Sequence, residues 1–287
     1  MESLKGYLSL IRPINCLIMG FAVIVGAAIA NPYALAGSWR NLFFGFLTGF
    51  LLTGASMVIN DYYDREIDAI NEPERPIPSG LVNPKKALVF AFILSITGLI
   101  SAYLTNTANL FCFITALLSW IVSVTYVTVG KKTGLTGNFL VSLCVAVPFI
   151  YGSLAISNSL LLNVLVFAAM AFLSNTGREI TKGIVDVEGD KSRNIQTLAV
   201  SHGNRKAAFA AVAFYLAAVS LSPIPIFLNL ANTIFYLPIV AFTDVGFIVS
   251  SVSLLRSHSR ENARKIKKVT LLLFATGLTA FMLGAVG

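Results

Sequence analysis

The sequence predicts an all-α integral membrane protein with about nine transmembrane helices. Of its 287 residues, 56% are hydrophobic and only 12% are charged, whereas soluble domains carry about 25% charged residues. The apolar residues also gather in runs long enough to cross a bilayer, which takes about 20 mostly apolar residues. Because lipid offers the backbone no hydrogen-bond partners, we expect runs of this kind to be helices.

Nine such runs follow one another along the chain. Several are separated by short breaks that are rich in Asn and Ser and carry almost no charge, as is typical of turns. The runs lie near 14–30, 41–59, 87–105, 110–129, 136–156, 160–180, 207–228, 233–255 and 269–286. No cleavable leader stands out before them, so we expect residues 1–287 to form a single membrane-embedded domain.

The basic residues gather on one side of this predicted arrangement. Of the 21 Lys and Arg residues, all except Arg40 fall in the N-terminal segment, at 60–86, at 131–132, at 178–206 and at 256–268. Basic loops stay cytoplasmic, so we expect a multi-pass cell-membrane protein with a cytoplasmic N-terminus. The net charge of +8 then lies on the cytoplasmic face, where it attracts anionic membrane lipids. Nucleic acid is excluded as a partner because no soluble basic domain is expected to hold it.

An acidic cluster, Asn60-Asp61-Tyr62-Tyr63-Asp64-Arg65-Glu66-Ile67-Asp68, follows the second run. On a helix, residues three or four apart lie on the same face. We therefore expect the side chains of Asn60, Asp61, Asp64 and Asp68 to point in one direction on the cytoplasmic side.

A second acidic cluster, Asp186-Val187-Glu188-Gly189-Asp190, follows the sixth run. By the same spacing, we expect Asp186 and Asp190 to share a helix face with Asn175, Glu179 and Lys182, while Glu66 and Glu188 point elsewhere. A solvated acidic helix end would explain one such cluster. Two clusters on one side of a membrane favour bound cations instead, and Mg²⁺ carrying a diphosphate suits these oxygen ligands.

Basic and amide side chains accompany the two clusters. Arg and Lys side chains hold phosphate oxygens in many sites where magnesium bridges carboxylates to a phosphate. We expect these basic side chains, apart from Arg12, to lack acidic partners in the protein; an ion pair between Lys182 and Glu179 is the alternative. The candidates are Arg12, Asn15, Arg65, Arg75, Lys131, Lys132, Lys182, Lys191 and Arg193.

The two clusters together resemble the paired motifs of the UbiA superfamily of intramembrane prenyltransferases. Arg12-Pro13-Ile14-Asn15, residues 74–80 and Gly177-Arg178-Glu179-Ile180-Thr181-Lys182 resemble that family too. The likeness covers essentially the whole chain. It implies helices around a central cavity open to the cytoplasmic side, and Mg²⁺-dependent transfer of a polyprenyl group from a polyprenyl diphosphate donor to an acceptor.

The resemblance leads to a hypothesis for each candidate residue. Asn60, Asp61, Asp64 and Asp68 hold one magnesium ion, and Asp186 and Asp190 hold the other. The catalytic candidates are Asp64, Asp68, Asp186, Asp190 and Glu179. The candidates for the diphosphate are Arg65, Lys131, Lys132 and Lys191. The candidates for the acceptor and for the allylic cation are Arg12, Asn15, Lys182, Arg193 and Tyr126.

The acceptor is the least determined part of this interpretation. Residues 12–16 and 178–180 most resemble the subfamily that makes archaeal ether lipids. That likeness implies a lipid phosphate acceptor, 3-O-geranylgeranylglyceryl phosphate, alkylated at its sn-2 hydroxyl by geranylgeranyl diphosphate. An aromatic acceptor of a quinone, haem or chlorophyll pathway is the alternative. An ion-coupled transporter is an alternative of another class, but transporters place ionisable residues near the bilayer midplane, where only Asp244 is expected.

Overall fold

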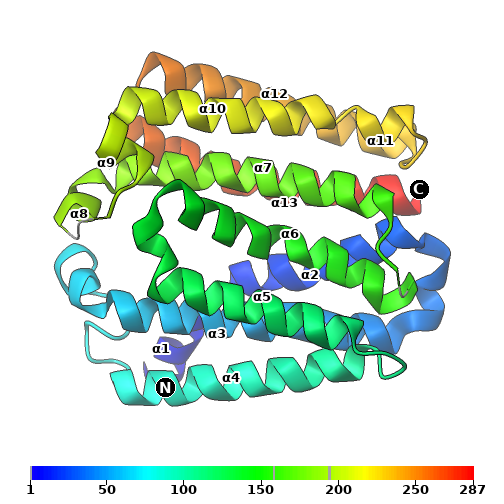
Figure 1. The fold of residues 1–287 in the computed structure, drawn as a ribbon, viewed down its shortest axis with the longest axis horizontal. Coiled ribbons are helices and arrows are strands. Elements are labelled where there is room, and N and C mark those ends of the chain that lie inside the picture. The colour runs from blue at the N-terminus through cyan, green and yellow to red at the C-terminus, as the bar shows by residue number, and fades with distance from the viewer. Residues whose placement is uncertain (1, 158, 193–194) are drawn as a thin grey trace.

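The computed structural model describes residues 2–157, 159–192 and 195–287, and within these ranges it contains helices and no strand. The long helices lie side by side in one bundle (Figure 1). They are α2 (Pro13–Ala30), α3 (Trp39–Asn71), α4 (Pro84–Thr105), α5 (Phe111–Thr128), α6 (Leu135–Ser157), α7 (Leu162–Val185), α10 (Asn204–Leu221), α12 (Thr233–Arg256) and α13 (Arg260–Val286). The short elements are α1 (Glu2–Ile11), η1 (Pro32–Ala34), η2 (Ala36–Ser38), η3 (Gly130–Thr133), α8 (Val187–Ser192), α9 (Leu198–His202) and α11 (Ile224–Phe227).

Eight segments of the described chain are long and apolar enough to cross a membrane, and they match eight of the nine predicted runs. The remaining run, 160–180, lies in α7, which has 24 residues and packs against α6, α10 and α13. Its N-terminal half is apolar, whereas its C-terminal half carries Asn175, Arg178 and Glu179. A polar half of this kind on a helix inside the bundle marks a functional segment of a membrane protein.

The bundle consists of two groups of helices joined along one seam. One group contains α2 to α6, the other contains α7, α10, α12 and α13, and contacts of α6 with α7 and of α2 with α13 join them. Glycines permit the closest approaches, as in many membrane bundles. A Cβ placed on Gly152 of α6 would lie 2.1 Å from the carbonyl oxygen of Val23 in α2.

Both acidic clusters lie at the same end of the bundle, together with α1, η3 and α9 (Figure 1). The first cluster occupies the final part of α3, so its predicted helical face is confirmed. For the second, the prediction of one continuous face is wrong, because α7 ends at Val185 and Asp190 belongs to the separate helix α8. Arg260 at the start of α13 donates from Nε to the Val185 carbonyl at 3.1 Å, which satisfies an end of α7 where the chain turns.

Candidate functional site

Two buried aspartates of α3 are held by arginines from outside the helix. The side chains of Asp61 and Asp68 are 6% and 9% exposed. Asp61 Oδ1 lies 2.7 Å from Arg12 Nη2 and 3.6 Å from Arg75 Nη1, and Asp68 Oδ2 lies 2.7 Å from the same Arg75 nitrogen. Buried carboxylates need such partners, because an unpaired charge is costly to remove from water.

These two arginines lie in short segments between helices, Arg12 just before α2 and Arg75 just after α3. Arg12 has a left-handed conformation with φ of 51° between α1 and α2, an uncommon geometry for a residue other than glycine. Arg75 lies in the turn after α3 and also pairs with Glu72. Burial lowers the pKa of Arg75, but the charges of Asp68 and Asp61 more than offset that effect, and its pKa is raised. The expectation that Arg75 is unpaired is therefore wrong.

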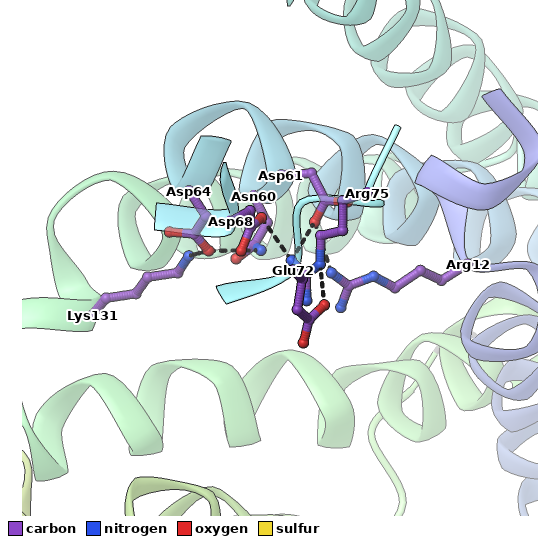
Figure 2. Close-up of polar contacts among 8 residues, drawn as sticks. All are labelled: Arg12, Asn60, Asp61, Asp64, Asp68, Glu72, Arg75 and Lys131. Atoms are coloured by element: carbon purple, nitrogen blue, oxygen red, sulfur yellow. Dashed lines mark hydrogen bonds and ion pairs between the residues drawn. The ribbon is translucent and has the colours of Figure 1, made fainter. Parts of the chain in front are cut away.

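A lysine approaches the same cluster from the opposite side (Figure 2). Lys131 Nζ of η3 lies 2.7 Å from Asp64 Oδ2, and Asn60 Nδ2 donates to the same oxygen at 3.0 Å. The Lys131 side chain is 19% exposed, whereas its neighbour Lys132 is exposed and has no ion pair within the described part of the chain. The expectation that Lys131 lacks an acidic partner is therefore wrong, and the structure distinguishes two lysines that look alike in the sequence.

Two residues predicted near the first cluster lie apart from its buried pairs. Arg65 donates to the Tyr62 carbonyl at 2.9 Å and stacks over the Tyr62 ring at 4.4 Å. It also pairs with Glu66 at 3.4 Å, so the expectation that it lacks an acidic partner is wrong. Asn15, in the first turn of α2, makes no side-chain hydrogen bond to any residue that the structure describes. Glu66 is 84% exposed, so the prediction that it points away is confirmed.

The second cluster centres on a buried glutamate of α7. Glu179, 8% exposed, accepts from Arg178 Nη1 at 3.1 Å and from Lys182 Nζ at 3.4 Å. Asp186 is partly exposed and has no ion pair within the described residues. Lys182 thus pairs with Glu179, as the ion-pair alternative predicted, and is not an unpaired cation.

The remaining residues predicted for the second cluster vary in position. Lys191 on α8 is exposed, and Arg193 lies outside the residues that the structure describes. Glu188 is 89% exposed, as predicted. Asp190, the partner of Asp186 in the motif, is partly exposed, and its backbone N–H donates to the Asp186 carbonyl at 2.8 Å.

Tyr126, near the end of α5, links the two clusters. It lies near enough to Asp64 of the first cluster, and to Lys182, Glu179 and Asp190 around the second, for their charges to act on its phenol group. The two motifs are far apart in the sequence but therefore belong to one polar region.

Two cations of this region were not chosen from the sequence. Arg178 contacts Glu179 directly, and Lys267 of α13 interacts electrostatically with Arg178, Lys182 and Asp186. The basic segment 256–268 resembles an ordinary membrane-surface segment, so only helix periodicity separated the half-buried Lys267 from its exposed neighbour Lys268.

The donor atoms of both clusters fit magnesium in kind. Magnesium prefers hard oxygen ligands and is bound in proteins by one or two carboxylates together with substrate phosphates. The α3 cluster supplies aspartate oxygens on one face, with Arg12, Arg75 and Lys131 beside them. Within the described residues, no three His, Cys, Asp or Glu side chains are already arranged around a metal position. Substrate oxygens would therefore complete any such site.

An apolar cavity lies among α2, α6, α7, α10, α12 and α13. Asp244 of α12 lines it and accepts a 2.5 Å hydrogen bond from the hydroxyl of Ser222. Ser222 lies where α10 ends before Pro223, and its carbonyl accepts from Tyr236 at 2.9 Å. Side-chain partners of this kind satisfy backbone groups where proline interrupts a membrane helix. Asp244 is therefore hydrogen-bonded to a residue at this break. The cavity predicted to open to the cytoplasm stays a prediction.

Known proteins resemble this chain along its whole length. A digeranylgeranylglyceryl phosphate synthase from Archaeoglobus fulgidus is 38% identical over 99% of this chain and 98% of its own. A solved structure of digeranylgeranylglyceryl phosphate synthase in membranes has a TM-score of 0.78 at 32% identity, covering 100% of this chain and 99% of that one. A UbiA homolog from Archaeoglobus fulgidus bound to DMAPP and Mg²⁺ shares the fold, with a TM-score of 0.69 at 19% identity over 96% and 99% of the two chains.

The motif resemblance found in the sequence extends to a full family match. The model of the UbiA prenyltransferase family matches residues 19–285. An ion-coupled transporter is therefore no longer a candidate. The chain is a multi-pass membrane protein that belongs to the UbiA prenyltransferase family.

Proposed function

We propose that this protein transfers a geranylgeranyl group from geranylgeranyl diphosphate to the sn-2 hydroxyl of 3-O-geranylgeranylglyceryl phosphate, with Mg²⁺ as cofactor. The observation that carries the proposal is that both aspartate clusters lie at one end of the bundle, where charged groups of both lie near Tyr126. A relative that is 38% identical over 99% of this chain is named as a digeranylgeranylglyceryl phosphate synthase, and that name supports this acceptor. The UbiA homolog bound to DMAPP and Mg²⁺ supports the same plan for the donor.

Cations around the α3 cluster bind the donor. Lys131 reaches the cluster from η3, and Arg12 and Arg75 reach it from the other side (Figure 2). We assign donor diphosphate oxygens to Lys131, since charge-assisted hydrogen bonds are stronger than neutral ones. Arg12 and Arg75 position Asp61 and Asp68. Lys132 and Lys191 are exposed, and Arg65 is engaged with Tyr62, so these three are secondary candidates.

Asn60, Asp61, Asp64 and Asp68 would hold one magnesium ion, and Asp186 and Asp190 the other. When bound, magnesium neutralises the negative charge that develops on the leaving diphosphate. The bond from the prenyl C1 to the diphosphate oxygen breaks, and a bond from C1 to the sn-2 oxygen forms. The released diphosphate takes up the hydroxyl proton, because its oxygens become basic once the bond to C1 has broken.

The allylic cation needs negative charge and protection from water. Glu179 and Tyr126 lie near each other, and we assign them to the cation, which a carboxylate and an aromatic face both stabilise. The apolar walls of the bundle exclude water, which prevents hydrolysis of a reactive intermediate. Both clusters face the cytoplasm in this proposal, because they lie at the end of the bundle that carries the basic segments.

The test is prenyl transfer by the purified protein with labelled geranylgeranyl diphosphate and Mg²⁺. 3-O-geranylgeranylglyceryl phosphate and 4-hydroxybenzoate are offered in separate reactions. Product with the lipid phosphate alone, lost in Asp64→Ala, is the expected result. Product with the aromatic acid alone would keep the family and overturn the proposed acceptor.

A further inference from the structure

The apolar cavity has a lining with few polar groups. Met170 and Ser174 of α7 line it, and its remaining walls are apolar apart from Thr243 and Asp244. Asp244 already has a hydrogen bond to Ser222. Such a cavity suits a hydrocarbon chain, because burying an ion or an unpaired polar group there would be costly.

The helices that line the cavity carry cations beyond one end of it. On α7, Met170, Ser174 and Arg178 follow at steps of four residues and thus share a face. On α13, Lys267 precedes the lining residue Phe274 by seven residues and lies on the same face. Both cations lie toward the end of the bundle that holds the acidic clusters. The cavity and the cations together have an amphiphilic character.

The positive charge at this end is only partly neutralised inside the protein. Glu179 accepts hydrogen bonds from Arg178 and Lys182, whereas Lys267 has no direct ion pair in the described part of the chain and only interacts electrostatically with Glu179 and Asp186. In addition, the buried Nε of Arg178 has no hydrogen-bond partner among the described residues. Buried polar groups normally have partners, so each exception calls for an explanation.

We propose that the cavity and the two cations Arg178 and Lys267 form the binding site of the lipid monophosphate acceptor. Its isoprenoid chain occupies the cavity and its phosphate binds the cations. The assignment rests on the proposed function and adds the position of the acceptor. It separates the acceptor phosphate at Arg178 and Lys267 from the donor diphosphate at Lys131, which pairs with Asp64 of the other cluster.

The burial of Lys267 argues against bulk membrane lipid as the occupant. Lys267 is partly buried, whereas Lys268, Arg264 and Lys265 on the same helix are exposed. Headgroups at the membrane surface would contact the exposed side chains. A phosphate at Lys267 must instead belong to a molecule that enters the bundle.

The first test compares Lys267→Gln with the matched control Lys268→Gln in the transfer reaction. Loss of a charge-assisted contact predicts a rise of roughly 10-fold to 100-fold in the acceptor KM of Lys267→Gln. The donor KM and the Lys268→Gln variant stay at wild-type values. An unchanged acceptor KM, or an equal rise in both KM values, overturns the assignment.

The second test measures binding directly and does not need turnover. In EDTA, 3-O-geranylgeranylglyceryl phosphate is titrated against the wild type, Lys267→Gln and Gly277→Val, with its phosphate-free analogue geranylgeranylglycerol as a second probe. Gly277 lines the cavity, and an added Cβ there meets only Thr243 Cγ2, at 3.7 Å. The melting temperature of Gly277→Val is compared with that of the wild type, to show that the variant folds.

Each variant removes a different part of the proposed site. Lys267→Gln weakens binding of the phosphate only, and Gly277→Val weakens binding of both probes. If the wild type transfers no prenyl group, the proposed function fails and this binding experiment still decides. Equal binding of the lipid phosphate by all three proteins would then overturn the site.

Discussion

The adjacent lysines 131 and 132 provide the sharpest test of the donor site. Lys131 Nζ lies 2.7 Å from Asp64 Oδ2 and its side chain is 19% exposed, whereas Lys132 is exposed and has no ion pair in the described chain. We predict that Lys131→Ala loses about 10²–10³-fold in kcat, the usual loss when one preorganised donor to a developing negative charge is removed. Lys132→Ala changes activity by about 2-fold, as exposed substitutions generally do.

The assay is initial-rate prenyl transfer at varied donor concentration, with melting temperatures of both variants measured in the same detergent. A purely structural role for Lys131 would lower the melting temperature and leave the kcat of the folded fraction intact. The double variant Lys131→Ala/Asp64→Ala provides a second criterion, because its activity can be compared with that of each single variant. Residues in contact couple by about 0.5–3 kcal/mol, so the double variant should be scarcely worse than Asp64→Ala alone. Equal losses from Lys131→Ala and Lys132→Ala would refute the reasoning.

Two further predictions concern the close packing of α6 against α2 and the ion pairs of Arg75 with Asp61 and Asp68. Gly152→Ala should lower the melting temperature, because its Cβ would lie 2.1 Å from a backbone oxygen of α2 and overpacking costs about 1–3 kcal/mol; Gly37→Ala, with nothing within 4 Å, is the control. Arg75→Ala should destabilise by about 3–5 kcal/mol, because Asp68 and partly Asp61 lose a buried ion-pair partner. Arg75→Lys should recover only part of this loss, since an ammonium cannot reproduce a guanidinium fork. If Arg75→Ala melts at the wild-type temperature, the ion pairs of Arg75 contribute nothing to stability.

The membrane architecture was predictable because its signals are local. Apolar runs of bilayer length and aspartates three or four residues apart are read directly from the chain, and both are found in the structure. The helical face of Asp61 and Asp68 followed from periodicity alone. The motif resemblance also identified the family that the full-length comparisons confirm.

Tertiary pairing was not predictable, because it depends on which distant segments meet. Periodicity does not reveal that Arg75 turns back onto Asp68, or that Lys131 pairs with Asp64 while Lys132 remains exposed. Periodicity also suggested one face from Glu179 to Asp190. The helix instead ends at Val185, where a side chain from α13 satisfies its last carbonyl. Lys267 was likewise not chosen, because the basic segment 256–268 resembles an ordinary membrane-surface segment and only helix periodicity separates Lys267 from Lys268.

The central claim is that both aspartate clusters act together with magnesium in prenyl transfer to a lipid phosphate. The most direct measurement is product formation from labelled geranylgeranyl diphosphate and 3-O-geranylgeranylglyceryl phosphate by the wild type, Asp64→Ala and Asp186→Ala. Each protein is assayed with Mg²⁺, with EDTA, and with Mg²⁺ restored. The account predicts product only from the wild type, abolished by EDTA and recovered with Mg²⁺. Magnesium-dependent turnover that persists in either folded alanine variant would contradict it.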